Sequence, residues 1–147
     1  MALNDTLMED MKNAMKAKDK DSLTVIRSLK SALMNYKIKV GHELNSDDEL
    51  DVLATALKQR RESLEEFSKA KRQDLIDATN KEIETIEKYM PKQLSNDELE
   101  ATVEETIKEV EATSKKDFGD VMQALMPKIK GKADGKAASV MVGKKLN

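Results

Sequence analysis

The sequence predicts an all-α protein, and three features of its 147 residues support that fold class. Charged residues make up 37% of the chain and aromatic residues only 3%, a composition typical of long helices with one face in water. Apolar residues recur at three- and four-residue steps through most of the chain, which is the period of an α-helix. The clusters of β-branched residues and turn signals that a sandwich or barrel requires are rare.

The first 40 residues predict two helices joined by a polar break. The first is expected from about Leu3 to Ala17, because leucine and methionine recur there at four-residue steps. The second is expected from Leu23 to Val40, after a break at residues 19–22. Gly41 supplies its C-terminal stop, because glycine readily adopts the left-handed conformation that ends many helices.

A helical hairpin is expected next. Ser46 is predicted to be the N-cap of a long third helix, since three acidic residues follow it where the helix dipole favours negative charge. A turn around Lys71 to Asp74 separates that helix from a fourth, which Pro91 ends because proline lacks the N–H donor. These four helices should form an N-terminal bundle.

A domain boundary is predicted where a new helix begins after Pro91. Ser95 and Glu98 have the spacing of a capping box, in which each side chain accepts a hydrogen bond from the other residue's backbone N–H. We therefore expect an N-terminal helical bundle over residues 1–92 and a small three-helix domain over residues 93–147. A unit of about fifty residues buries little surface, so the second domain should be marginal alone.

Three helices are predicted in this C-terminal domain. The first follows the capping box and is acidic on its outer face. The second begins near Phe118 and again has apolar residues at three- and four-residue steps. Asp134 is expected to cap the third, which contains Ala138 and Val142.

The sequence contains no cysteine, which excludes disulfides, thiolate nucleophiles and cysteine-based zinc sites. Its first residues are interrupted by acids and lack the apolar core of a signal peptide. No stretch approaches the roughly 18 apolar residues of a membrane span. We therefore expect a soluble cytoplasmic protein with no membrane partner.

Residues with catalytic chemistry are sparse. The single histidine, His42, lies in a polar loop close to acidic residues. It would serve there either as a metal ligand or proton shuttle, or as a solvated loop residue. No phosphate-binding glycine loop and no Gly-x-Ser-x-Gly nucleophile motif occurs. The sequence predicts no catalytic set, no cofactor and no metal site.

The last twenty residues are strongly basic. From Lys128 to Asn147 there are six lysines and one acid, Asp134, whereas the whole chain has a net charge of −2. Glycines alternate with the lysines, which lets a backbone approach a phosphate closely. We predict a nucleic-acid-binding turn between two helices, formed by Lys128, Lys130, Gly131, Lys132, Gly135 and Lys136. The alternative is a flexible, solvated turn whose lysines compensate a helix dipole.

A second basic cluster, Lys58-Gln59-Arg60-Arg61, lies on the predicted third helix among glutamates. Three- and four-residue spacing lets Lys58 and Arg61 pair with Glu62 and Glu65. The simplest interpretation of this cluster is a salt-bridged surface.

Three longer motifs follow one another along the chain. They are Lys58-Gln-Arg-Arg-Glu-Ser-Leu-Glu-Glu-Phe-Ser-Lys-Ala, Tyr89-Met-Pro-Lys-Gln-Leu-Ser and Phe118-Gly-Asp-Val-Met-Gln-Ala-Leu-Met-Pro-Lys-Ile-Lys-Gly-Lys-Ala-Asp-Gly. Together they resemble the GatB/YqeY family, and its stand-alone members most closely, over essentially the whole chain. Lys71 departs from the family pattern, which favours glycine there, and Thr113-Ser114 replaces the usual Gly-Ala.

The resemblance implies an all-helical fold whose C-terminal domain is similar to the tail of GatB, a subunit of the glutamine-dependent aminoacyl-tRNA amidotransferase. In that enzyme the tail helps to hold tRNA, while amide transfer takes place in other domains that are missing here. The family is associated with carbon–nitrogen ligase activity using glutamine as amido-N-donor. That activity describes a relative's whole assembly and need not describe this chain.

The leading hypothesis is a tRNA-associated accessory protein that contacts the tRNA backbone through the basic turn. The alternative is a protein-interaction module for a translation or amidotransferase enzyme, which would use apolar helix faces and bind no nucleic acid of its own. A third, enzymatic hypothesis requires an ATP site or a nucleophile, and the sequence shows neither.

Overall fold

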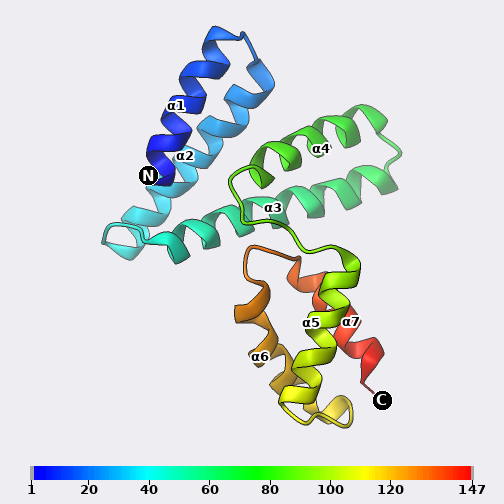
Figure 1. The fold of residues 1–147 in the computed structure, drawn as a ribbon. Helices are drawn as coiled ribbons and strands as arrows, with labels where there is room; N and C mark the ends of the chain where they lie inside the picture. Colours follow the sequence, from blue (N-terminus) through cyan, green and yellow to red (C-terminus); the bar gives the residue numbers. More distant parts are fainter. Residues whose placement is uncertain (1, 147) are drawn as a thin grey trace. The chain divides into compact units, whose positions relative to one another are not determined.

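The computed structural model describes residues 2–146, and all regular structure in that range is helical (Figure 1). The elements follow in the order α1 (Leu3–Lys16), α2 (Lys20–Val40), α3 (Ser46–Lys69), α4 (Gln73–Glu87), α5 (Asn96–Glu109), the short 3₁₀ helix η1 (Lys115–Asp117), α6 (Phe118–Ile129) and α7 (Gly135–Lys145). The predicted all-α fold class is confirmed. Within residues 2–146 no helix is both long and apolar enough to cross a membrane.

The chain forms two compact units, the first ending at Met90 and the second beginning at Pro91. Each unit has its own apolar core. Fully buried side chains in the first unit come from α1 to α4 and include Leu7, Leu29, Leu53, Leu57 and Ile86. Those in the second unit come from α5 to α7 and include Val103, Val121, Leu125, Ile129 and Val142. The predicted domain bounds, residues 1–92 and 93–147, and the marginal stability of the second domain alone stay predictions.

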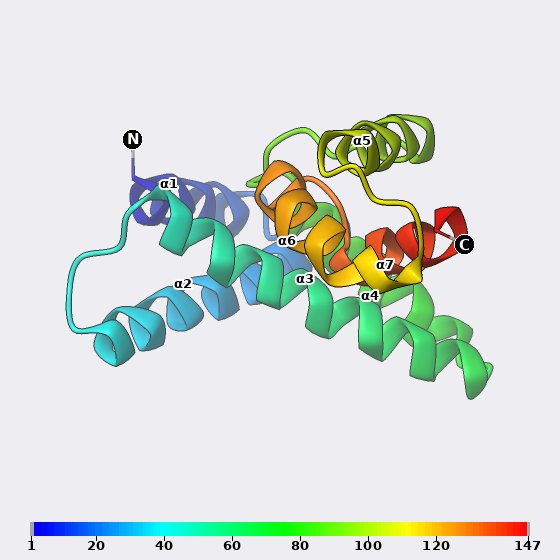
Figure 2. The same cartoon turned by 90° about the horizontal axis from the view of Figure 1, so that it is seen from below.

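Two helical hairpins build the first unit. In both views α1 lies beside α2, and α3 lies beside α4 (Figures 1 and 2). The predicted polar break after α1 is shorter than expected, because the Asp19 side chain accepts the backbone N–H of Ser22 at 3.1 Å and caps α2. As a result α2 begins at Lys20. Gly41, with φ +77°, ends α2 as predicted.

The start of α3 corrects one prediction, because Asn45 rather than Ser46 is the N-cap. Asn45 Oδ1 accepts the backbone N–H of Asp48 at 2.9 Å, and Asp48 Oδ2 accepts the N–H of Asn45 at 3.1 Å. The two residues form a complete capping box. The sequence was ambiguous here because asparagine and serine are both favoured N-caps and stand side by side.

The turn between α3 and α4 contains a residue in the left-handed region. Lys71 has φ +57°, its N–H donates to Ser68 O at 3.2 Å, and the next N–H, that of Arg72, donates to Phe67 O at 3.1 Å. A left-handed residue with such bonds is the usual way in which a helix ends, and glycine is the usual residue there. A lysine at this position carries backbone strain that glycine would avoid.

Tyr89 ties α1 to the segment that follows α4. Its hydroxyl donates a hydrogen bond to Asp10 Oδ2 at 2.5 Å. Burial raises the pKa of Tyr89 above its ordinary value because it disfavours a charged phenolate, and Asp10 raises it further by accepting a hydrogen bond from the hydroxyl and repelling a second negative charge. The hydroxyl therefore remains protonated and able to donate.

In the second unit, the sequence correctly predicted the N-caps of α5 and α7. Ser95 Oγ accepts the Glu98 N–H at 3.1 Å, and Glu98 Oε1 accepts the Ser95 N–H at 3.0 Å, which is the predicted capping box of α5. Asp134 is the N-cap of α7, and its Oδ1 accepts the Lys136 N–H at 3.3 Å. These caps fix the residues at which α5 and α7 begin. The Asp134 cap therefore also sets where the turn between α6 and α7 ends.

Candidate nucleic-acid interface

The basic turn lies between α6 and α7, and two hydrogen bonds hold it to the segment before α5. Gln93 Nε2 donates to the carbonyl oxygen of Gly131 at 2.7 Å. The Leu94 N–H donates to the carbonyl oxygen of Lys132 at 2.8 Å. Both bonds are short enough to be well formed. They give the turn a defined backbone conformation, which argues against the flexible-loop alternative.

The two glycines of the predicted site differ in whether the structure requires glycine there. Gly131 is buried and has φ +72°, a conformation that L-residues rarely adopt. A Cβ placed on Gly135 would lie 3.4 Å from Cε of Met126, which is an ordinary van der Waals contact with the end of a flexible side chain. Gly131 therefore reverses the chain, whereas a small side chain could replace the hydrogen of Gly135.

Lys128 is oriented toward α5. Its ammonium is paired with the Glu109 carboxylate, and it also lies 3.2 Å from Thr106 Oγ1. The side chain is 32% exposed. A phosphate would compete with Glu109 for this ammonium, so Lys128 is not freely available to a ligand.

The remaining three lysines of the predicted set gather around the turn. Lys132 is exposed, and among residues 2–146 its ammonium has no carboxylate partner. Lys136 is exposed in the first turn of α7, which contains no acidic residue, and Lys130 is half-buried just after α6. Three cations and one acid, the N-cap Asp134, lie within seven residues at a helix N-terminus, so the surface there has a local positive charge.

The sequence count of six lysines overstates the charge available to a ligand. Lys145, in the last turn of α7, lies 2.7 Å from both Glu100 Oε1 and Glu104 Oε1 of α5. Hydrogen bonds to these carboxylates raise the pKa of Lys145, and its ammonium lowers the pKa of Glu104. Lys144 is exposed, but it lies at the far end of α7, about 12 Å along the helix from Lys136.

The other sequence candidates belong to the first unit, whereas the turn belongs to the second. His42 is exposed, and its Nδ1 lies 2.8 Å from the carbonyl oxygen of Glu43. Among the residues that the structure describes, no group of three or more histidine or acidic side chains is arranged to hold a metal. Lys58 and Glu62 are both exposed. Within residues 2–146 they do not form the ion pair that their four-residue spacing allows.

Comparison with known proteins identifies relatives. The family described as Yqey-like protein matches residues 4–146. A relative in Pyrenophora tritici-repentis is 29% identical over 130 residues, covering 86% of this chain and 71% of the relative. One in Saccharomyces cerevisiae (strain YJM789) is 31% identical over 132 residues, covering 89% and 70%. One in Clavispora lusitaniae is 41% identical over 90 residues, covering 60% and 52%.

All three relatives bear the name "Altered inheritance of mitochondria protein 41, mitochondrial". This name contradicts the cytoplasmic location predicted from the sequence. The prediction was wrong because it inferred a cellular compartment from composition. A chain without cysteine fits any reducing compartment, so its composition does not distinguish the cytosol from an organelle.

The family match extends across both compact units. It contains the cluster at Lys58, the segment from Tyr89 through the capping box, and the basic turn. With nearly all of its residues matched, the chain belongs to the family of Yqey-like proteins.

Proposed function

We propose that this chain binds the phosphate backbone of tRNA through the turn that carries Lys130, Lys132 and Lys136, and that it acts as an accessory protein. The observation that supports this most directly is Lys132, which is exposed and has no carboxylate partner within residues 2–146. Its carbonyl and that of the preceding residue are held by Leu94 and Gln93. Because the backbone is already fixed, contact with a phosphate orders only the lysine side chain and not the turn as well.

The resemblance of the C-terminal motif to the GatB tail supports tRNA as the nucleic acid. No aromatic side chain lies among the lysines of the turn, so base stacking of the single-strand type is not expected. Contacts would be to phosphates and to the shape of the folded RNA. An accessory role would leave the chemistry of amide transfer to other proteins.

The proposal predicts weak, salt-sensitive binding. Neutralising about three phosphates gives a log–log dependence of affinity on salt with a slope of roughly −2 to −3. Lys128 should contribute little to this slope, because Glu109 already holds its ammonium.

The test is a titration of fluorescent total tRNA with the full chain at two or more salt concentrations. Lys130→Glu combined with Lys132→Glu should weaken binding at least tenfold. Lys115→Glu combined with Lys116→Glu is the matched control, because it changes the charge equally on exposed residues about 18 Å away along α6.

Circular dichroism should show the same helical signal in both double variants. Unchanged tRNA affinity in the turn variant would refute the assignment of the turn. An equal loss in the control would show that only the net charge of the chain matters.

A protein-interaction role is the second candidate, and one surface favours it. Met34 is 66% exposed and Ile38 is 73% exposed, and the four-residue spacing places them on one face of α2. Apolar pairs of this kind are common in protein contacts. A complex with a translation enzyme that is insensitive to salt, lost in Ile38→Asp and kept in Lys132→Glu would support this role.

A further inference from the structure

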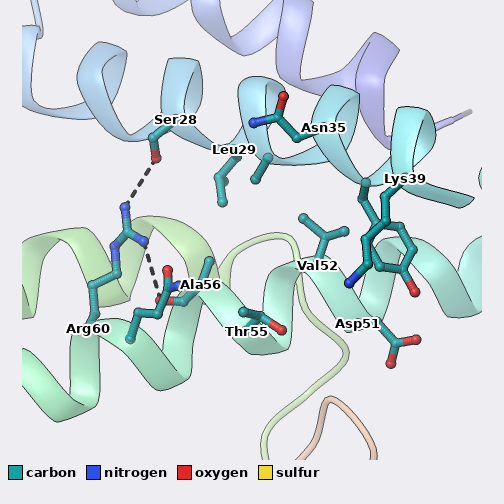
Figure 3. A pocket seen from close by; sticks show the side chains of 12 residues that line it. Ser28, Leu29, Asn35, Lys39, Asp51, Val52, Thr55, Ala56 and Arg60 are labelled. Carbon is teal, nitrogen blue, oxygen red and sulfur yellow. Dashed lines mark hydrogen bonds between the residues drawn. The ribbon is translucent and has the colours of Figure 1, made fainter.

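A groove between α2 and α3 of the first unit has no part in the proposed RNA contact (Figure 3). Its volume is about 410 Å³, within the range of small-molecule sites. Leu29, Val52 and Ala56 form a buried apolar floor, with exposed fractions of 1%, 6% and 5%. The exposed polar side chains of Asn35 and Thr55 lie on the rim. An apolar floor with a polar rim is the usual lining of a ligand site.

One end of the groove is formed by Arg60. Its Nη2 donates to Ser28 Oγ on α2 at 3.1 Å, and its Nη1 lies 3.4 Å from the carbonyl oxygen of Ala56 (Figure 3). These contacts orient the guanidinium across the groove. A guanidinium has five N–H donors, so donors remain for a ligand.

Within the part of the chain that the structure describes, Arg60 also lacks a counter-charge. It is half-buried, and among residues 2–146 no carboxylate pairs with it. A partly desolvated cation beside an apolar floor is stabilised when an anion joins it, and the planar guanidinium matches carboxylate and phosphate groups.

The other end of the groove has a different electrostatic character. Lys39 and Asp51 both lie there, opposite Arg60 (Figure 3). Their charges have opposite signs, so this end is close to neutral. Asp51 and Arg60 are nine positions apart on α3, which corresponds to about 13 Å along the helix. The charge pattern therefore places an anionic head at Arg60 and an uncharged body along the floor.

We propose that this groove binds a small organic anion with an apolar body. A carboxylate or phosphate head would accept hydrogen bonds from Arg60, and the body would cover Leu29, Val52 and Ala56. This gives Arg60 a role distinct from that of its neighbours in the Lys58-Gln-Arg-Arg cluster. The site lies wholly in the first unit and is independent of the basic turn.

The experiment is an NMR titration of the ¹⁵N-labelled full chain with four probes: octanoate, octyl phosphate, octanol and acetate. Octanoate or octyl phosphate should shift the amide signals of residues lining the groove in a saturable way, and the stronger of the two identifies the head group. Octanol lacks the charge and acetate lacks the body, so each should bind at least tenfold more weakly.

Two variants separate the charge from the apolar floor. Arg60→Gln should weaken binding of the octyl anion at least tenfold, whereas Arg61→Gln should leave it within twofold. Ala32→Leu keeps Arg60 but fills part of the groove, and it should also weaken binding. Arg60→Lys should restore part of the affinity that Arg60→Gln loses.

Three results would overturn the proposal. They are no saturable shift with either octyl anion, shifts confined to residues outside α2 and α3, and equal affinity in Arg60→Gln and the unmodified chain. Amide spectra of each variant without probe show whether the fold is intact. Should Arg60→Gln fail to fold, Ala32→Leu and the octanol comparison decide the question.

Discussion

The side-chain amide of Gln93 donates a hydrogen bond to the carbonyl oxygen of Gly131, 2.7 Å away. This bond joins the segment before α5 to the basic turn. Because Gly131 is buried, its carbonyl loses a partner that water does not easily replace when the amide is removed. The bond therefore stabilises the second unit and fixes the position of the lysines that follow.

Gln93→Ala should lower the free energy of unfolding by about 1–3 kcal/mol, the usual cost of leaving a buried acceptor unpaired. Urea unfolding, followed on the amide NMR signals of the second unit, measures this change. Gln123→Ala, an exposed position on α6, should change stability by less than about 0.5 kcal/mol. Equal stability in the two variants would show that the hydrogen bond contributes nothing.

Lys71→Gly should stabilise the protein by about 0.5–1 kcal/mol. A left-handed conformation costs a non-glycine residue about 1–2 kcal/mol, and the greater freedom of glycine in the unfolded chain offsets part of that gain. Thermal unfolding of the first unit gives the measurement. The control is Lys69→Gly at the end of α3, where helical propensity predicts a loss of up to about 1 kcal/mol. A lower Tm for Lys71→Gly would contradict this account.

Leu125→Ala should cost about 2–5 kcal/mol, because the side chain is fully buried in the core of the second unit and its removal leaves a cavity. Met126→Ala, one residue later and 42% exposed, should cost less than about 1 kcal/mol. Urea unfolding of both variants tests the orientation of α6. The reverse order of the two losses would mean that α6 presents a different face to the core.

The parts of the fold that depend on nearby residues could be predicted from the sequence. The Ser95–Glu98 capping box and the Asp134 cap involve residues within three positions of each other, so spacing alone reveals them. Asn45 was missed because Ser46, its neighbour, is an equally good cap. Local competition between similar residues thus explains the error at the start of α3, whereas the start of α2 was placed too late because the Asp19 cap was not recognised.

The candidate site was harder to predict, because contacts between distant residues decide which lysines are available. Lys145 and Glu100 are 45 positions apart, and Lys128 and Glu109 are 19 apart. A count of charges along the chain cannot show that α5 holds two of the six lysines. The Gln93–Gly131 bond, across 38 positions, was invisible for the same reason.

The acid sensitivity of the second unit should depend on Glu98. Backbone and side-chain hydrogen bonds from Ser95 hold the pKa of Glu98 below its ordinary value of 4.5. A carboxyl group whose pKa is lower in the folded chain than in the unfolded chain stabilises the fold above that ordinary value. This stabilisation is lost as the pH falls through the folded-state pKa, because the unfolded chain then binds more protons.

Glu98→Gln removes the charge but retains a side-chain oxygen that accepts a hydrogen bond. The variant should be less stable than the unmodified chain at pH 7, and this difference should shrink as the pH falls below 4.5. Urea midpoints of the second unit between pH 7 and pH 3 give the comparison. Asp97→Asn removes a charge from the same helical turn without removing the cap, so it serves as the control. Parallel pH curves for Glu98→Gln and the unmodified chain would show that ionised Glu98 does not stabilise α5.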